Sequence, residues 1–282
     1  MIRLRRIRSA EHLGGFTGPA FQAKLEKLLL CYYDEGCTGL VDFKPKARQI
    51  WPQAKALLKR ESADKCAYCE ADTSVVAHGD VEHFRPKSAY WWLAYSLDNY
   101  TFSCQVCNQI HKGDRFPIAG PKLAQPRLPA AAPSDGIQRA KLAARLCPDP
   151  AKTTDAALKR RLAGEGAHLP HPYLQDPEAL LAWSVNADTE ELAVIARDSS
   201  EPAQRAFEAV RNVLGLNRTE LLRLRWIHYD ELETLALALQ EGQFSNDQRL
   251  KLLTKLRRQA GNDRPFAAMK RFYLRAWGLL DD

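Results

Sequence analysis

The strings Cys66-Ala-Tyr-Cys69 and Cys104-Gln-Val-Cys107 bracket the segment Val81-Glu82-His83-Phe84-Arg85-Pro86-Lys87. Two C-x-x-C pairs are typical of a tetrahedral zinc site, because the two-residue spacing lets a tight turn aim both sulfurs at one ion. A disulfide framework is disfavoured, since no secretory signal is evident and seven cysteines would leave one unpaired. We therefore predict that the two pairs together hold one structural zinc ion.

Glu82 and His83 bring reactive groups into the segment between the cysteine pairs. Hydrolysis of a phosphodiester needs a base that activates water, a metal ion that neutralises charge, and cations that hold the backbone. His83 is the best-placed base, since an imidazole has an ordinary pKa of about 6.5. Glu82 and Asn108 both present oxygen to a hard cation such as Mg²⁺. Taken alone, Glu82-His83 would indicate a solvated strand end, but its place between two zinc-binding turns favours a reactive site.

The stretch from Cys66 to Pro117 resembles the HNH endonuclease motif, which is built on a ββα-metal fold. The resemblance rests on an acidic residue before a histidine, a following proline, Asn99, and a C-x-x-C pair followed by a polar residue and a lysine. It is more specific for the HNH nucleases of Septu-type bacterial anti-phage systems, including those associated with retrons. The strings that carry it are Cys66-Ala-Tyr-Cys69-Glu70, Val81 to Lys87, and Asn99-Tyr-Thr-Phe-Ser-Cys104-Gln-Val-Cys107-Asn108 through Lys112-Gly113-Asp-Arg-Phe116-Pro117, with weaker echoes in His171-Pro172-Tyr173 to Asp176-Pro177 and Leu214-Gly-Leu-Asn-Arg218.

The resemblance implies a role for each residue of the motif. His83 would be the general base, Glu82 and Asn108 would bind a catalytic Mg²⁺ or Mn²⁺, and Asn99 would brace the loop that carries the base. Arg85, Lys87 and Lys112 are the nearest candidates for phosphate contacts.

The motif of this chain differs at one position from the His-Asn-His pattern that gives the family its name. The residue after the last cysteine is Asn108 instead of histidine, so the motif reads H-N-N, which the family tolerates because an amide oxygen still binds Mg²⁺. His111 follows three residues later, and in a helix it would lie one turn from Asn108. We prefer Asn108 as the second metal ligand and keep His111 as an alternative ligand or phosphate contact.

The same resemblance implies a substrate and a protein partner, and one alternative function competes with it. It implies a nuclease that cuts nucleic acid, with double-stranded DNA as the expected substrate, and a partner subunit of the ABC/SMC-type ATPase class. The chain would then be silent until that partner assembles with it. The alternative is a zinc-knuckle module that binds nucleic acid or protein without cutting, which explains the cysteines but leaves Glu82, His83 and Asn99 without a role.

The charge of the chain is concentrated at its start. Of a formal net charge of +7, residues 1–60 contribute twelve Lys and Arg against five Asp and Glu, whereas residues 61–120 are net acidic. Clustered basic charge beside a reactive segment favours a phosphate-binding surface, although a merely solvated basic face would have the same composition. No apolar run approaches the roughly 18 residues of a membrane span. We therefore expect a soluble, cytoplasmic protein without a membrane partner.

The expected fold class is α+β and mainly α, with a central zinc-stabilised ββα-metal module between helical regions. We divide the 282 residues into a basic arm with helices (1–62), the nuclease module with its four-cysteine zinc site (63–120), a connector with a β-hairpin (121–198) and a helical region (199–282). In the arm, apolar spacing predicts helices over Pro19 to Tyr33 and Pro45 to Ser62, with Pro52 kinking or restarting the second.

Within the module, Val75, Val76, Val81 and Phe84 suit a hairpin with Gly79-Asp80 as its turn, and a helix is expected to begin near Cys104. The aromatic run from Tyr90 to Tyr95 favours core packing over base stacking. Beyond the module we expect the following elements: one helix over Ile137 to Leu146, strands over Ala179 to Val185 and Glu191 to Arg197, and helices opened by Pro202, capped by Thr219, opened by a Ser245–Gln248 capping box, and spanning Pro265 to Trp277.

Overall fold

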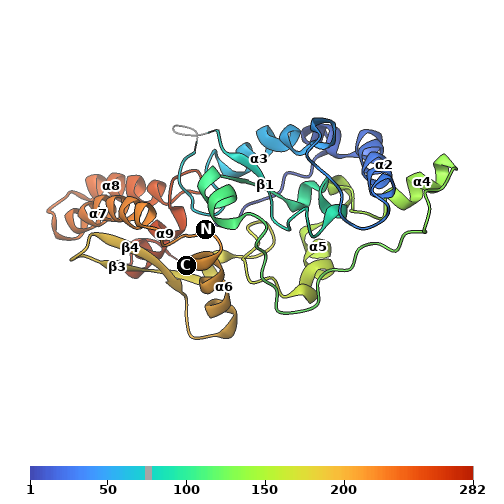
Figure 1. The fold of residues 1–282 in the computed structure, drawn as a ribbon. Coiled ribbons are helices and arrows are strands. Elements are labelled where there is room, and N and C mark those ends of the chain that lie inside the picture. The colour runs from blue at the N-terminus through green and yellow to red at the C-terminus, as the bar shows by residue number, and fades with distance from the viewer. Residues whose placement is uncertain (74–77, 282) are drawn as a thin grey trace. The chain divides into compact units, whose positions relative to one another are not determined.

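The computed structural model in Figure 1 describes residues 1–73 and 78–281. The chain forms two compact units. The first consists of Met1–Leu4, Ser62–Ala77 and Leu169–Asp282, and the second of Arg5–Glu61 and His78–His168. The described residues are of the α+β class, as predicted, with many helices and two separate two-stranded sheets. None of the helices in this described part combines the length and hydropathy that crossing a membrane requires.

The second unit opens with a short helix, α1 (Ala10–Leu13), and then the long helix α2 (Gly18–Asp34). Pro19 stands in the first turn of α2, and Gly36, with a φ of +70°, follows its end, so the predicted helix is confirmed at both ends. The region predicted as a second helix is instead three short pieces, η2 (Lys46–Arg48), η3 (Trp51–Ala54) and α3 (Lys55–Ser62). The break falls at Gln49 and Ile50, and Pro52 lies in the first turn of η3, as the predicted restart requires.

The central sheet of the second unit pairs strand β1 (Asp80–His83) with strand β2 (Tyr100–Ser103) in antiparallel register. The predicted turn at Gly79-Asp80 was wrong, because Asp80 begins strand β1 opposite Ser103, and β1 pairs with β2, a strand that the sequence did not predict. Val75 and Val76, assigned to that hairpin, lie outside the described residues. A helical segment, η6 (Val106–Lys112), follows β2 and carries Cys107, Asn108 and Lys112, but it is a π-helix and not an α-helix.

An aromatic core lies against this sheet. The run from Tyr90 to Tyr95, which includes η4 (Trp91–Leu93), is buried, and the η5 turn (Leu97–Asn99) then leads into β2. Trp91 stacks on Tyr32 of α2 with ring centroids 4.4 Å apart, and the cluster continues through Phe16, Leu28, Tyr100 and Phe102. Core packing, as predicted, is therefore the role of the aromatic run.

The remainder of the second unit holds one helix more than the sequence predicted. The expected helix is α4 (Gly136–Ala143), which Asp135 caps, and the additional one is α5 (Asp155–Leu162), which Thr154 caps. Two 3₁₀ turns, η7 (Pro150–Lys152) and η8 (Ala163–Glu165), flank α5. Only one residue of α5, Leu158, is buried, so its sequence shows little apolar periodicity.

Glu165, at the end of η8, is the centre of a buried polar network. Its carboxylate accepts hydrogen bonds from Arg85 Nε at 2.7 Å, the Tyr90 hydroxyl at 2.6 Å and the backbone N–H of Leu123 at 2.9 Å. The Glu165 side chain is 1% exposed and that of Arg85 is 4% exposed. Through these hydrogen bonds Glu165 connects the loop after β1, which contains Arg85, to residues up to eighty positions away in the sequence.

Replacing Glu165 with alanine is expected to lower the free energy of unfolding by about 3–5 kcal/mol, because it leaves the buried Arg85 guanidinium without its counter-ion. Chemical denaturation measures the change. Asp247→Ala is the matched control, since it breaks an exposed ion pair with Lys251, and its expected cost is about 1 kcal/mol or less. Equal stability of the two variants would contradict the role assigned to Glu165.

The first unit contains a hairpin and a group of helices. Strands β3 (Leu181–Asn186) and β4 (Glu191–Ala196) follow the η9 turn (Pro177–Ala179), and they pair in antiparallel register as predicted. The helices are α6 (Glu201–Asn212), α7 (Thr219–Glu241), α8 (Asn246–Gln259) and α9 (Ala267–Ala276) (Figure 1). The Ser245–Gln248 capping box of α8 is present. The predicted Thr219 cap was wrong, since Thr219 is the first residue inside α7.

Candidate active site

The four cysteines of the two C-x-x-C pairs come together, with their sulfur atoms within 4.8 Å of one another. Each pair is shaped by a tight turn: Glu70 N donates to Cys66 O at 3.0 Å, and Cys107 N donates to Cys104 Sγ at 3.4 Å. None of the cysteines in the described residues is in a disulfide. Sulfurs around a zinc ion with bonds of about 2.3 Å would lie roughly 3.8 Å apart. The cluster can therefore bind a metal ion such as zinc with little adjustment.

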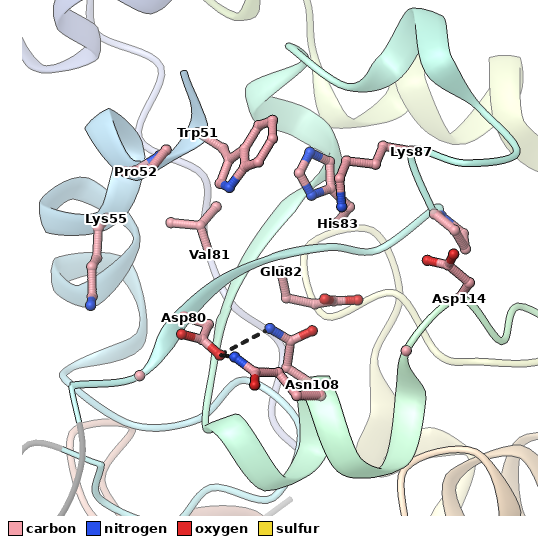
Figure 2. A pocket seen from close by; sticks show the side chains of 14 residues that line it. Trp51, Pro52, Lys55, Asp80, Val81, Glu82, His83, Lys87, Asn108 and Asp114 are labelled. Carbon is pink, nitrogen blue, oxygen red and sulfur yellow. Dashed lines mark hydrogen bonds between the residues drawn. The ribbon is translucent and has the colours of Figure 1, made fainter. Parts of the chain in front are cut away.

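A cavity of about 410 Å³ opens beside β1, and Glu82, His83, Lys87 and Asn108 of the motif line it (Figure 2). Strand β1 and the loop after it provide one side, η6 and its C-terminal end another, and the η3–α3 segment a third. The lining residues are Trp51, Pro52, Lys55, Gly79, Asp80, Val81, Glu82, His83, Pro86, Lys87, Asn108, Gln109, Gly113 and Asp114. The cavity thus combines carboxylates, amides, an imidazole and two lysines.

His83 is held in one orientation at the end of β1. Its Nε2 lies 3.1 Å from the carbonyl oxygen of Ala94, and its ring packs edge-on against Trp51 and Tyr100, each at 5.0 Å between centroids. Because a carbonyl only accepts, Nε2 carries the hydrogen and Nδ1 keeps a lone pair. Burial, with the nearby positive charge of Lys87, lowers the pKa of His83 to about 3. The ring is therefore neutral at pH 7, the form that accepts a proton.

Glu82 is paired inside the site with Lys112. Its Oε1 lies 2.5 Å from Lys112 Nζ, and the same ammonium donates to the carbonyl oxygen of His83 at 3.0 Å. Burial raises the pKa of Glu82, and the charge of Lys112 opposes that shift. Lys112 is 1% exposed and does not line the cavity where a phosphate would enter. Its ammonium instead holds the Glu82 carboxylate and the backbone at the end of β1.

Asn108 lies on η6, in the same cavity as Glu82. Its Nδ2 donates to Asp80 Oδ2 at 3.1 Å, and Gln109 Nε2 donates to the same oxygen at 2.8 Å (Figure 2). His111, the alternative ligand, is not among the residues that line the cavity. Asn108 and Glu82 therefore line the same cavity, and His111 does not.

The oxygen donors of the cavity fit a hard cation. Among the described residues, the cysteine cluster is the one group of three or more His, Cys, Asp or Glu side chains close enough to share an ion. Mg²⁺ is usually bound through one or two carboxylates together with water and substrate phosphate. Glu82 and Asn108 offer this cavity a carboxylate and an amide oxygen, which are donor types that Mg²⁺ or Mn²⁺ accepts.

Asn99 joins the loop after β1 to the turn before β2. Its Oδ1 accepts from the backbone N–H of Arg85 at 2.9 Å, and its Nδ2 donates to the carbonyl oxygen of the same residue at 2.9 Å. Its own carbonyl accepts from Phe84 N at 2.8 Å. Asn99 is buried and does not line the cavity, so its contacts hold the backbone that follows His83.

The four residues proposed to contact phosphate occupy different environments. Arg85 is buried against Glu165, with its guanidinium 5.2 Å from the centre of the Phe116 ring. Lys112 is paired with Glu82, and His111 lies outside the cavity. Lys87 lines the cavity, with its ammonium 5.4 Å from the centre of the Trp51 ring. Of the four, Lys87 alone lines the site.

Sequence reasoning missed several lining residues. Trp51 and Lys55 enter from η3 and α3, and only tertiary packing brings them to β1, so the motif did not point to them. Asp80 was detectable, because side chains two apart in a strand share a face and Asp80 stands two residues before Glu82. Gln109 and Asp114 complete the set.

Comparison with known proteins gives one partial match. No family model matches the chain, and no solved structure matches it. A segment of the chain is 43% identical over 77 residues to the Septu protein PtuB of Bacillus mycoides (strain KBAB4). The match covers 23% of this chain and 26% of that protein, so the chain spans about a quarter of the relative's length. Part of this chain is therefore similar to a Septu protein.

Proposed function

We propose that this chain is a metal-dependent HNH endonuclease that hydrolyses phosphodiester bonds of nucleic acid, with double-stranded DNA as the expected substrate. One observation carries the proposal: a histidine whose Nε2 lies against a backbone carbonyl oxygen lines the same cavity as a carboxylate and a side-chain amide. The order of elements along the chain, β1 and β2 followed by the helical segment η6, also supports the ββα-metal arrangement.

In this mechanism His83 is the general base. Nδ1 removes a proton from a water molecule while Nε2–H stays bound to the Ala94 carbonyl, which keeps the ring in place as it becomes charged. Asn99 would hold the backbone after the base, through its two hydrogen bonds to Arg85. Glu82 and Asn108 would hold Mg²⁺ or Mn²⁺, which when bound neutralises charge on the phosphate and on the leaving oxygen.

Lys87 and Lys55 would hold the nucleic-acid backbone. Both line the cavity together with Asp80, Glu82 and Asp114, so the site contains cations for a phosphate as well as carboxylates for a metal ion. The Trp51 ring beside the Lys87 ammonium limits where that charge can lie. Residues 1–60 hold an excess of basic residues, but Arg6, Arg8 and Arg48 among them are paired with carboxylates. The support for a polyanionic partner therefore comes from the cations that line the cavity.

The biological role that we propose is anti-phage defence. It rests on the partial identity to a Septu protein and on the resemblance of the motif to HNH nucleases of Septu-type systems. By the same resemblance, an ABC/SMC-type ATPase is the proposed partner subunit. The four-cysteine cluster would hold a separate zinc ion that supports the fold and takes no part in the reaction.

The proposal is tested by incubating zinc-loaded protein with supercoiled plasmid and Mg²⁺ or Mn²⁺, with and without EDTA. We expect nicked or linear DNA only when the divalent ion is available. If folded protein with its zinc retained shifts DNA in a gel but never cuts it, even with the proposed ATPase added, a binding-only zinc-knuckle module replaces the nuclease. Cutting that begins only when the ATPase is added would identify a partner-dependent nuclease.

A further inference from the structure

Asp80 occupies a special place at the start of β1. Its carboxylate oxygen Oδ2 accepts hydrogen bonds from two consecutive side-chain amides of η6, Asn108 Nδ2 at 3.1 Å and Gln109 Nε2 at 2.8 Å (Figure 2). Asp80 lines the cavity, and in the sheet it lies opposite Ser103, the residue before Cys104. One side chain thus links the first strand of the module to the helix that carries the proposed metal ligand.

The hydrogen bond from Asn108 decides which end of its amide faces the cavity. A side-chain amide has a donating NH₂ end and an accepting oxygen, whereas an ionised carboxylate only accepts. The NH₂ end of Asn108 must therefore face Asp80, and Oδ1 points away from it. Without Asp80 the amide could rotate and offer its NH₂ group where a cation needs an oxygen.

The local backbone supports this arrangement on both sides. In η6 the N–H of Gly113 donates to the carbonyl oxygen of Asn108 at 2.7 Å, an i→i+5 bond that widens the helical turn at this residue. On the strand side, Gly79 has a φ of +57°, and a Cβ there would collide with the Phe102 ring. Glycine at position 79 thus lets the chain enter β1 at Asp80.

We propose that Asp80 is the positioning residue for the second metal ligand: it orients the Asn108 amide so that Oδ1 joins Glu82 in binding the catalytic cation, without being a ligand itself. This inference rests on the proposed function. It applies to the metal-binding step and predicts that an accepting oxygen at position 80, and not its negative charge, is what the site requires.

The test measures Mn²⁺ affinity of the zinc-loaded full chain by electron paramagnetic resonance of free Mn²⁺, with no nucleic acid present. Asp80→Ala is expected to weaken Mn²⁺ binding about 10–100-fold, the usual effect of losing a residue that orients a ligand. Asp80→Asn is expected to restore most of the affinity, because its amide oxygen can still accept from Asn108. Gln105→Ala is the matched control, since it removes an exposed side-chain amide that does not line the cavity and should leave the affinity near that of the unmodified protein.

Two results would overturn the inference. Equal losses in Asp80→Asn and Asp80→Ala would make Asp80 a charged ligand, and unchanged affinity in both would give it no part in binding. Thermal unfolding of each variant separates these results from a merely structural role. If Asp80 only stabilised the fold, both variants would unfold at a lower temperature, and Asp80→Asn would not restore the Mn²⁺ affinity. Failure of the proposed function gives a different pattern, in which Glu82→Ala also binds Mn²⁺ as well as the unmodified chain.

Discussion

Serine in place of Cys107 is expected to abolish zinc binding and to unfold the chain around the cluster. Cys107 is fully buried, and its sulfur lies within 4.8 Å of the other three. A structural zinc ion contributes apparent binding free energies of about 10–16 kcal/mol in small zinc-binding peptides at pH 7. Most domains are stable by only about 5–15 kcal/mol, so losing the zinc ion together with this thiolate would remove a free energy of the same size as the stability of a domain. Zinc content by mass spectrometry and thermal unfolding by circular dichroism measure both effects.

Cys37→Ser is the control for this prediction. Cys37 is a half-buried thiol outside the cluster, so its replacement should change neither zinc content nor the unfolding temperature. The zinc account would be refuted by a Cys107→Ser protein that unfolds at the same temperature as Cys37→Ser, or by unmodified protein that purifies without metal and is folded.

Alanine in place of His83 is expected to slow cleavage by about 10²–10⁴-fold, the usual contribution of a positioned general base. The variant should keep its zinc, because His83 lies in the cavity and not in the cysteine cluster. Single-turnover cleavage with saturating enzyme measures the chemical step without interference from product release.

His111→Ala is the matched control, since it removes an imidazole of η6 that does not line the cavity. We expect its cleavage rate to remain close to that of the unmodified protein. A His83→Ala protein that cuts as fast as His111→Ala would remove His83 from the mechanism.

Features encoded by short stretches of sequence were predictable. The C-x-x-C spacing located the four thiols, the apolar spacing of α2 located that helix, and the Ser245 capping box located the start of α8. In each case the physical cause acts over a few residues, either a turn, a helical stripe or a cap.

The surroundings of the charged residues were not predictable in the same way. Arg85 and Lys112 looked like phosphate contacts from their places in the motif, yet Arg85 meets Glu165, eighty residues away, and Lys112 meets Glu82 across the sheet and helix. The cations that line the cavity are Lys87 and Lys55, and Lys55 comes from a helix before the module. Long-range packing decides which cation is buried and which lines the cavity, and the residues of the motif alone do not determine that packing.

The most direct test of the account is the dependence of the cleavage rate on Mg²⁺ concentration for unmodified protein and Glu82→Ala at equal zinc content. We predict a rate that saturates with Mg²⁺ in the unmodified protein and that needs far more Mg²⁺, or is lost, in Glu82→Ala, because Glu82 lines the cavity and is the charged metal ligand that we propose. Cleavage that is independent of Mg²⁺, or that has the same Mg²⁺ dependence in both proteins, would contradict the assignment of this cavity as the catalytic site.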